Sequence, residues 1–135
     1  MVYGVYMFTG YQLQILVDQP QTVNTVTQSV VGFSSTEQAS GAVDAQLHQW
    51  YQCAGRTITY HKDNAGQGVT LGTPTADPGG AHVISVRYQY GGQQHCEHAL
   101  TSRENVVVDV SACSVKPGNQ AVDVTGQIVD RIPHP

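Results

Sequence analysis

The sequence has few charged residues and no long apolar run. Charged residues make up 12% of the 135 residues, against about 25% in an average soluble domain. The longest apolar runs, such as residues 106–108, are far shorter than the ~20 residues of a membrane-spanning helix. The formal net charge is -4, and no cluster of basic residues is present to neutralise a phosphate backbone. We therefore expect neither a membrane span nor a nucleic-acid partner.

Recognisable catalytic motifs are also missing. The sequence contains no GxSxG elbow, no HExxH motif, no Walker loop and no GxGxxG turn between a strand and a helix. His95 and His98 could suggest a metal, but on a strand they point to opposite faces and cannot bind one ion together. The first residues lack the basic and apolar regions of a signal peptide, so an export signal would lie upstream of Met1. We expect no catalytic residue, no metal and no cofactor.

The chain has the length of one domain and is too short for two. Alternating and β-branched residues predict seven strands, at 11–17, 23–31, 56–61, 68–71, 81–90, 94–101 and 105–113. Short turns between several of them, such as Gly91–Gly92, indicate mostly antiparallel pairing in a meander. The predicted class is α+β: a single domain of residues 1–135 with a mostly antiparallel sheet, one inserted helix and one C-terminal helix.

Two amphipathic segments predict these helices. The first begins at Ser34 or Ser35, each of which starts a capping box, and ends at Gly55 in the position of a left-handed cap. Its apolar stripe consists of Ala39, Val43, Leu47, Trp50 and Ala54. The second covers about residues 118–131 and stops before Pro133.

Three cysteines leave one over, and a predicted hairpin indicates which two can pair. If residues 94–101 and 105–113 form a hairpin that turns near residues 102–105, Cys96 lies directly opposite Cys113. Directly opposed β-carbons are about 4.5–5.5 Å apart, close to disulfide range. Two buried reduced thiols are the alternative, and export of the protein would favour the disulfide.

The same register divides the 105–113 strand into two faces. Four apolar residues point to the predicted core: Val106, Val108, Val110 and Ala112. Four others point to the opposite face: Val107, Asp109, Ser111 and Cys113. His98 and Leu100 of the partner strand share that face. Asp109 is either a hydrogen-bonded structural residue or part of a polar cavity, and its aliphatic surroundings favour the structural role.

Cys53 lies near the end of the first predicted helix. It could be an activated thiol, with Arg56 beside it and His48 or His61 as a base. The end of a helix carries the negative end of the dipole, which disfavours the thiolate form. We therefore expect Cys53 to be an unreactive thiol that is buried or lacks its disulfide partner.

Five segments match one family pattern in order and spacing. They are 30–34 (VVGFS), 49–57 (QWYQCAGRT), 96–100 (CEHAL), 105–113 (NVVVDVSAC) and 119–122 (NQAV). Together they resemble the PknH-like extracellular domain over most of the chain from Tyr3 to Ile132. The resemblance implies an extracellular sensor domain of the mycobacterial cell envelope, with a central antiparallel sheet and a deep cleft for an unidentified ligand. Such domains occur on a Ser/Thr kinase or as stand-alone lipoproteins.

The family pattern also carries four cysteines in two disulfides. Cys96 and Cys113 match the last two, and Cys53 matches a cysteine whose partner lies before the first tyrosine. That partner is missing, so the resemblance implies that the N-terminal part of the domain is truncated, that the gene starts elsewhere, or that this is a divergent member. Any membrane attachment would then come only from an upstream anchor. The sequence departs from the pattern at His98, where arginine is common, and at Glu104, where asparagine is common.

These observations predict a non-catalytic domain that binds a small molecule or cell-wall ligand in a cleft beside the polar face of the 105–113 strand. The residues expected to border the cleft are Asp109, Ser111, Arg103, Trp50 and Tyr51. Trp50 belongs to the apolar stripe, which favours a core position over a ligand contact. The alternatives are a small secreted enzyme, with a nucleophile beside a base in its cleft, and a structural module that binds a protein through an apolar patch.

Overall fold

The computed structural model describes residues 7–18, 24–62, 65–88, 95–115 and 118–134. Its strands are β1 (Phe8–Val17), β2 (Thr25–Phe33), β3 (Thr57–Lys62), β4 (Ala65–Leu71), β5 (Thr75–Ala76), β6 (His82–Tyr88), β7 (His95–Arg103) and β8 (Val106–Ser114). Its helices are α1 (Thr36–Cys53) and α2 (Gln120–Val129). Each of the seven predicted strands is present, and β5 is a short addition. The predicted Gly91–Gly92 turn and the strand ends at Val23, Tyr90 and Gln94 lie outside the described residues.

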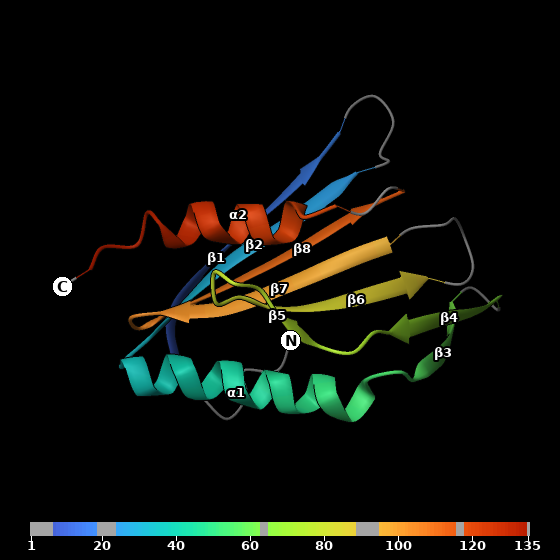
Figure 1. Cartoon of the computed structure of the whole chain (residues 1–135), viewed down its shortest axis with the longest axis horizontal. Coiled ribbons are helices and arrows are strands. Elements are labelled where there is room, and N and C mark those ends of the chain that lie inside the picture. Colours follow the sequence, from blue (N-terminus) through green and yellow to red (C-terminus); the bar gives the residue numbers. More distant parts are fainter. Residues whose placement is uncertain (1–6, 19–23, 63–64, 89–94, 116–117, 135) are drawn as a thin grey trace.

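The strands form one antiparallel sheet in the order β1-β2-β8-β7-β6-β4-β3, with β5 paired to β6. The two helices cover opposite faces of this sheet, which makes three layers (Figure 1). The α+β class with a single domain is confirmed. The meander prediction was only partly right, because β2 pairs with β8 rather than with β3. α1, an 18-residue helix and so about 27 Å long, carries the chain across the sheet from β2 to β3.

Local sequence explains both ends of α1. Of the two predicted capping residues Ser35 is the cap: its hydroxyl accepts a hydrogen bond from the backbone N–H of Gln38 at 3.2 Å. After the helix, Gly55 has a φ of 72°, the left-handed conformation that glycine adopts without strain. The backbone N–H of Gly55 donates to the carbonyl of Leu71 at 2.8 Å and so ties the helix end to β4.

The sheet has a hydrophobic core on each face. The α1-side core consists of Val31, Phe33, Ala39, Ala42, Val43, Trp50, Ile84, Leu100 and Val107. The α2-side core consists of Ala99, Val108, Val110, Ala112 and Ala121. Val108, Val110 and Ala112 face a core as predicted, but the prediction that the opposite face of β8 is the polar one was wrong, because α1 covers that face with a second core. Val107 is as fully buried there as Val108 is on the α2 side.

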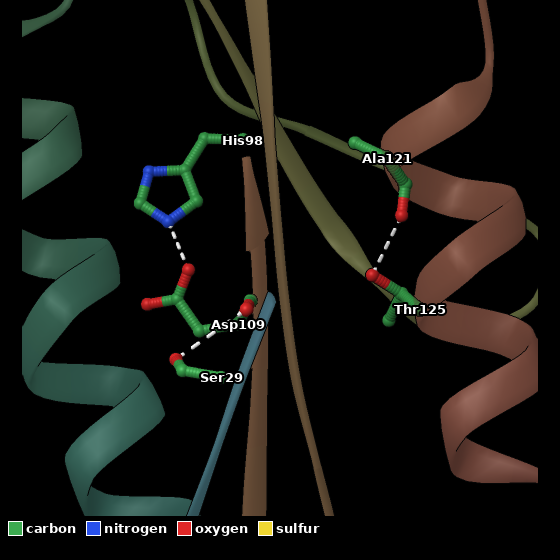
Figure 2. Close-up of polar contacts among 5 residues, drawn as sticks. All are labelled: Ser29, His98, Asp109, Ala121 and Thr125. Atoms are coloured by element: carbon green, nitrogen blue, oxygen red, sulfur yellow. Dashed lines mark hydrogen bonds and ion pairs between the residues drawn. The ribbon is translucent and has the colours of Figure 1, made fainter. Parts of the chain in front are cut away.

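α2 is shorter than predicted, and its apolar side packs against the α2-side core of the sheet. Ala121 and Thr125 are its buried residues, and the Thr125 hydroxyl donates to the Ala121 carbonyl at 2.7 Å (Figure 2). The buried hydroxyl therefore has its hydrogen bond within the helix. Among the described residues, neither helix is long and apolar enough to cross a membrane.

Candidate functional site

A polar contact is buried between the sheet and α1. Nε2 of His98 on β7 donates a hydrogen bond to a carboxylate oxygen of Asp109 on β8 (Figure 2). The register explains the contact, because Asp109 lies opposite Leu100 and diagonally across from His98 on the same face. The hydroxyl of Ser29 on β2 donates to the backbone carbonyl of Asp109 at 3.4 Å. Three neighbouring strands are therefore linked at Asp109.

Trp50 covers this contact from α1. The ring centroids of Trp50 and His98 lie 5.0 Å apart with 52° between their planes. Trp50 is 7% exposed and Asp109 is 4% exposed. Tyr51, one residue further along the helix, is exposed, and Ser111 is half-buried opposite His98. The contact thus places a hydrogen-bonded carboxylate in the interior, an arrangement in which the bond compensates for lost hydration.

A cavity of about 570 Å³ lies on the other face of the sheet, beside α2. Its walls are the end of β7, the turn after β5 and α2. Residues that contribute polar or charged groups are Asp77, Thr101, Arg103, Asp123, Thr125, Gln127 and Asp130. The volume lies in the range of about 300–1,000 Å³ that is typical of small-molecule sites. A smaller cavity of about 180 Å³ lies between Gln12, Gln28 and Ile128.

Arg103 brings the positive charge to the larger cavity. Its Nη2 donates to Nδ1 of His134 at 3.1 Å, and the same nitrogen of His134 lies 4.0 Å from Oε1 of Glu104. Nε of Arg103 is buried without a hydrogen-bond partner among the described residues. A buried donor without a partner costs about 1–3 kcal/mol. Arg103 also lines the cavity, so its guanidinium is the positively charged group that an acceptor bound there would meet.

The turn on the facing wall is held by its own hydrogen bonds. Oδ2 of Asp77 accepts from the backbone N–H of Gly79 at 2.7 Å, and the Asp77 carbonyl accepts from Gly80 at 2.8 Å. Gly80 has a φ of 96°, which a residue with a side chain rarely adopts. The backbone N–H of Asp77 donates to the carbonyl of Ala81 at 2.7 Å. These bonds give the cavity a defined wall and orient the Asp77 carboxylate.

Glu97 lies on β7 but lines neither cavity. Burial raises the pKa of Glu97 above its ordinary value of 4.5. Its Oε2 is buried without a hydrogen-bond partner in the described part of the chain. This carboxyl group is therefore a source of pH-dependent stability rather than a member of the site.

The cysteines are arranged as the hairpin register predicted. Cys96 and Cys113 are directly opposite one another and form a disulfide, with their Cα atoms 4.0 Å apart. Cys53 is the free cysteine of the described residues. Within the same residues, no group of three His, Cys, Asp or Glu side chains could hold a metal ion.

The five residues expected to border one cleft lie on two faces of the sheet. Arg103 lines the larger cavity on the α2 side. Asp109, Ser111 and Trp50 lie on the α1 side with Tyr51 beyond them, and none of these four lines either cavity described above. The sequence reasoning missed the cavity carboxylates, because Asp77 read as part of an exposed connection and α2 was considered only for its apolar side. The Asp77–Gly80 turn, with its Pro and two Gly residues beside an Asp, was the available signal.

A family model describes the chain as a PknH-like extracellular domain and matches residues 1–131. The chain belongs to this family. Serine/threonine-protein kinase PknH of Mycobacterium tuberculosis (strain ATCC 25618 / H37Rv) is 32% identical over 107 residues, which cover 79% of this chain. PknH of Mycobacterium bovis (strain ATCC BAA-935 / AF2122/97) is also 32% identical over 107 residues. The recognition of the family from the sequence is confirmed.

A solved structure supports the same conclusion for the fold. The crystal structure of the extracellular domain of PknH from Mycobacterium tuberculosis matches this PknH-like domain with a TM-score of 0.86 at 26% identity. The match covers 96% of this chain and 66% of that chain. This chain spans only 17% of the length of the Mycobacterium tuberculosis kinase. The PknH-like domain is extracytoplasmic, as its family is.

Proposed function

We propose that this PknH-like domain is a sensor that binds a ligand without chemical conversion, in the cavity beside α2. The observation that carries the proposal is a cavity of about 570 Å³ that Arg103 and three aspartates line. The family and the extracytoplasmic location support a role in detecting a molecule of the cell envelope. Since the named relatives are kinases, the domain would report binding to a kinase through an upstream membrane anchor. The alternative is that the domain, with the same binding site, is attached to the membrane as a lipoprotein rather than as part of a kinase.

The charges of the cavity indicate the class of ligand. Arg103 supplies one positive charge, and Asp77, Asp123 and Asp130 supply three carboxylates. A ligand that satisfies both signs carries hydrogen-bond donors or an amine together with an acceptor or an anionic group. The hydroxyl-rich and amine-bearing fragments of a cell wall have this combination. We therefore propose a polar cell-wall fragment, held by hydrogen bonds rather than by apolar contact.

The composition of the cavity supports binding over catalysis. Among the described residues that line it there is no Ser, Cys, His or Lys. The hydroxyl of Thr125 already donates within α2. An enzyme would need a nucleophile within hydrogen-bond reach of a base, and among the described residues that line this cavity no two side chains are joined by a hydrogen bond. The His98–Asp109 contact lies outside both cavities, and the Trp50 ring packs against His98.

Filling the cavity tests the proposal. Gly126 of α2 lines the cavity, and a Cβ added there meets no atom within 4 Å. Gly126→Leu therefore has room for its Cβ and extends an apolar side chain from the cavity wall, whereas Gly126→Ala adds one methyl group and is the matched control. Wild type and both variants are incubated with a soluble cell-envelope extract, and retained small molecules are identified by native mass spectrometry.

We expect wild type and Gly126→Ala to retain the same compound and Gly126→Leu to lose it. Equal retention by all three proteins would place the ligand elsewhere and contradict the proposed site. Conversion of the retained compound by wild type, with loss of turnover in Gly126→Leu, would support the enzyme alternative instead.

A further inference from the structure

The edge strand β1 offers an unpaired backbone to a partner. β1 is the first strand in the sheet order and pairs only with β2 among the described residues. All ten of its residues are exposed. The outer edge of such a strand presents N–H and C=O groups that can pair with another chain. Natural edge strands are commonly protected by charges, prolines or short length.

β1 has no charge, no proline and no short length to protect it, and the irregularity in its pairing with β2, between Phe8 and Gly10, lies at its first end. Its sequence, FTGYQLQILV, contains no charged residue and no proline. Tyr11, Leu13 and Ile15 are 71%, 55% and 59% exposed and lie on one face of the strand, which is the α1 face because Leu13 lies opposite Ser29. Gln12 and Gln14 alternate with them on the α2 face. The strand is therefore apolar on one face and amide-bearing on the other, with no charge to repel a copy of itself.

We propose that β1 pairs antiparallel with β1 of a second copy of this chain, about a two-fold axis at Leu13. In this register Leu13 lies opposite the partner's Leu13, Tyr11 opposite the partner's Ile15, and Gln12 opposite the partner's Gln14. The apolar side chains then form one continuous strip on the α1 face, and the glutamine amides lie opposite one another on the α2 face. The two-fold axis makes the Tyr11–Ile15 and Gln12–Gln14 pairs twice and the Leu13–Leu13 pair once, so a favourable off-axis pair counts double.

In the neighbouring registers, Gln12 and Gln14 no longer both lie opposite a glutamine of the partner. An axis at Gln12 places Gly10 opposite Gln14, and an axis at Gln14 places Gln12 opposite Leu16. The second of these sets an amide against an apolar side chain. The axis at Leu13 pairs residues 9–17 and leaves the charged Asp18 outside the paired stretch. Of the three axes, only this one sets both Gln12 and Gln14 opposite a glutamine of the partner, so the amide pattern favours this register.

A contact made by one strand from each copy is small. Interfaces below about 1,200 Å² of total buried area belong to weak and transient complexes. The dimer should therefore appear only at high protein concentration, and a covalent trap is the more sensitive test.

Cysteine trapping tests the register directly. Leu13→Cys is made in a Cys53→Ser background, because Cys53 is the other free thiol of the described residues. In the proposed dimer the two introduced thiols lie opposite one another, with β-carbons about 4.5–5.5 Å apart. Ile15→Cys in the same background is the control, since its two copies lie four residues apart along the paired strands. We expect at least about tenfold more disulfide-linked dimer from Leu13→Cys than from Ile15→Cys in an oxidised glutathione buffer.

Charge substitutions test the same register without covalent chemistry. Leu13→Lys places two ammonium groups opposite one another and should abolish the dimer seen by sedimentation velocity at high concentration. Ile58→Lys, at an exposed apolar residue of the opposite edge strand β3, is the matched control and should leave it unchanged. The double variant Gln12→Lys/Gln14→Glu sets opposite charges across the axis and should strengthen the dimer about fivefold.

Two results would overturn the proposal. One is equal trapping of the Leu13 and Ile15 cysteine variants together with a monomer at every concentration. This result would mean that another strand or an upstream segment, rather than a second copy, pairs with β1. The other is a dimer that Ile58→Lys disrupts and Leu13→Lys does not. Circular dichroism of each variant confirms that loss of the dimer is not loss of the fold.

Discussion

Removing the Cys96–Cys113 disulfide should lower the stability of the domain by a predictable amount. The bond joins residues 17 apart in the sequence, so its loss frees a loop of that length in the unfolded chain. In the chain-entropy model, a loop of this length corresponds to about 3 kcal/mol at 25 °C. With an unfolding entropy of about 2.1 cal/mol/K per residue, the same change lowers the midpoint of thermal unfolding by about 10 °C.

The comparison is best made in a Cys53→Ser background, which removes exchange with the free thiol. Cys96→Ala/Cys113→Ala is compared with its parent by differential scanning calorimetry, and the parent is also measured after reduction with dithiothreitol. We expect reduction and substitution to give similar losses, because the model assigns the effect to the unfolded chain, which both treatments release equally.

Two results would refute this reasoning. A loss below about 3 °C would mean that the unfolded hairpin already keeps the two residues together, so the disulfide removes little entropy. A loss near 10 °C after substitution but not after reduction would assign the effect to packing of the buried Cys96 and half-buried Cys113 side chains rather than to the loop.

Three further substitutions follow from the same structure. Asp109→Asn should lower the free energy of unfolding in urea by about 2 kcal/mol, because His98 loses its hydrogen bond to a charged carboxylate. Asp44→Asn, on the exposed side of α1, is the control and should change the free energy of unfolding little. Equal effects of the two substitutions would contradict this. Glu104 has a φ of 53°, so Glu104→Asn should stabilise the domain by about 1 kcal/mol, and a lower unfolding midpoint would count against left-handed strain. The pKa of Glu97 is raised by burial, so the stability of the domain should fall as the pH rises from 4.5 through the raised pKa of the folded state. Glu97→Gln should remove this loss and therefore stabilise the domain at pH 7 but not at pH 4. Parallel profiles of stability against pH for the two proteins would contradict this.

The hairpin shows how much of the fold the sequence can predict. The register that sets Cys96 opposite Cys113 follows from the positions of two strands and a short turn, and it held along the whole of β7 and β8. The same register correctly placed His98 and Asp109 on one face. Local information was sufficient because hairpin partners are close in sequence and side chains alternate with a period of two.

The pairing of strands that are distant in the sequence could not be predicted from local patterns. The pairing of β2 with β8 joins segments about 80 residues apart and depends on where α1 carries the chain. Without that placement, Val107 was expected on the face opposite the core, although it is fully buried. Of the expected cleft residues, Arg103 lines a cavity, and the rest of that cavity comes from a turn and a helix distant in sequence. Local patterns cannot tell which such segments meet.

The central claim, that a ligand binds at Arg103, is tested most directly by comparing Arg103→Gln with wild type. Arg87→Gln is the matched control, because Arg87 is exposed near the end of β6 and lines neither cavity. The compound retained from cell-envelope extract is titrated into each protein by calorimetry. A hydrogen bond to a charged group is worth about 1.5–3 kcal/mol. We therefore expect the dissociation constant to be at least about tenfold larger for Arg103→Gln and unchanged for Arg87→Gln. Equal affinity of all three proteins would contradict the claim.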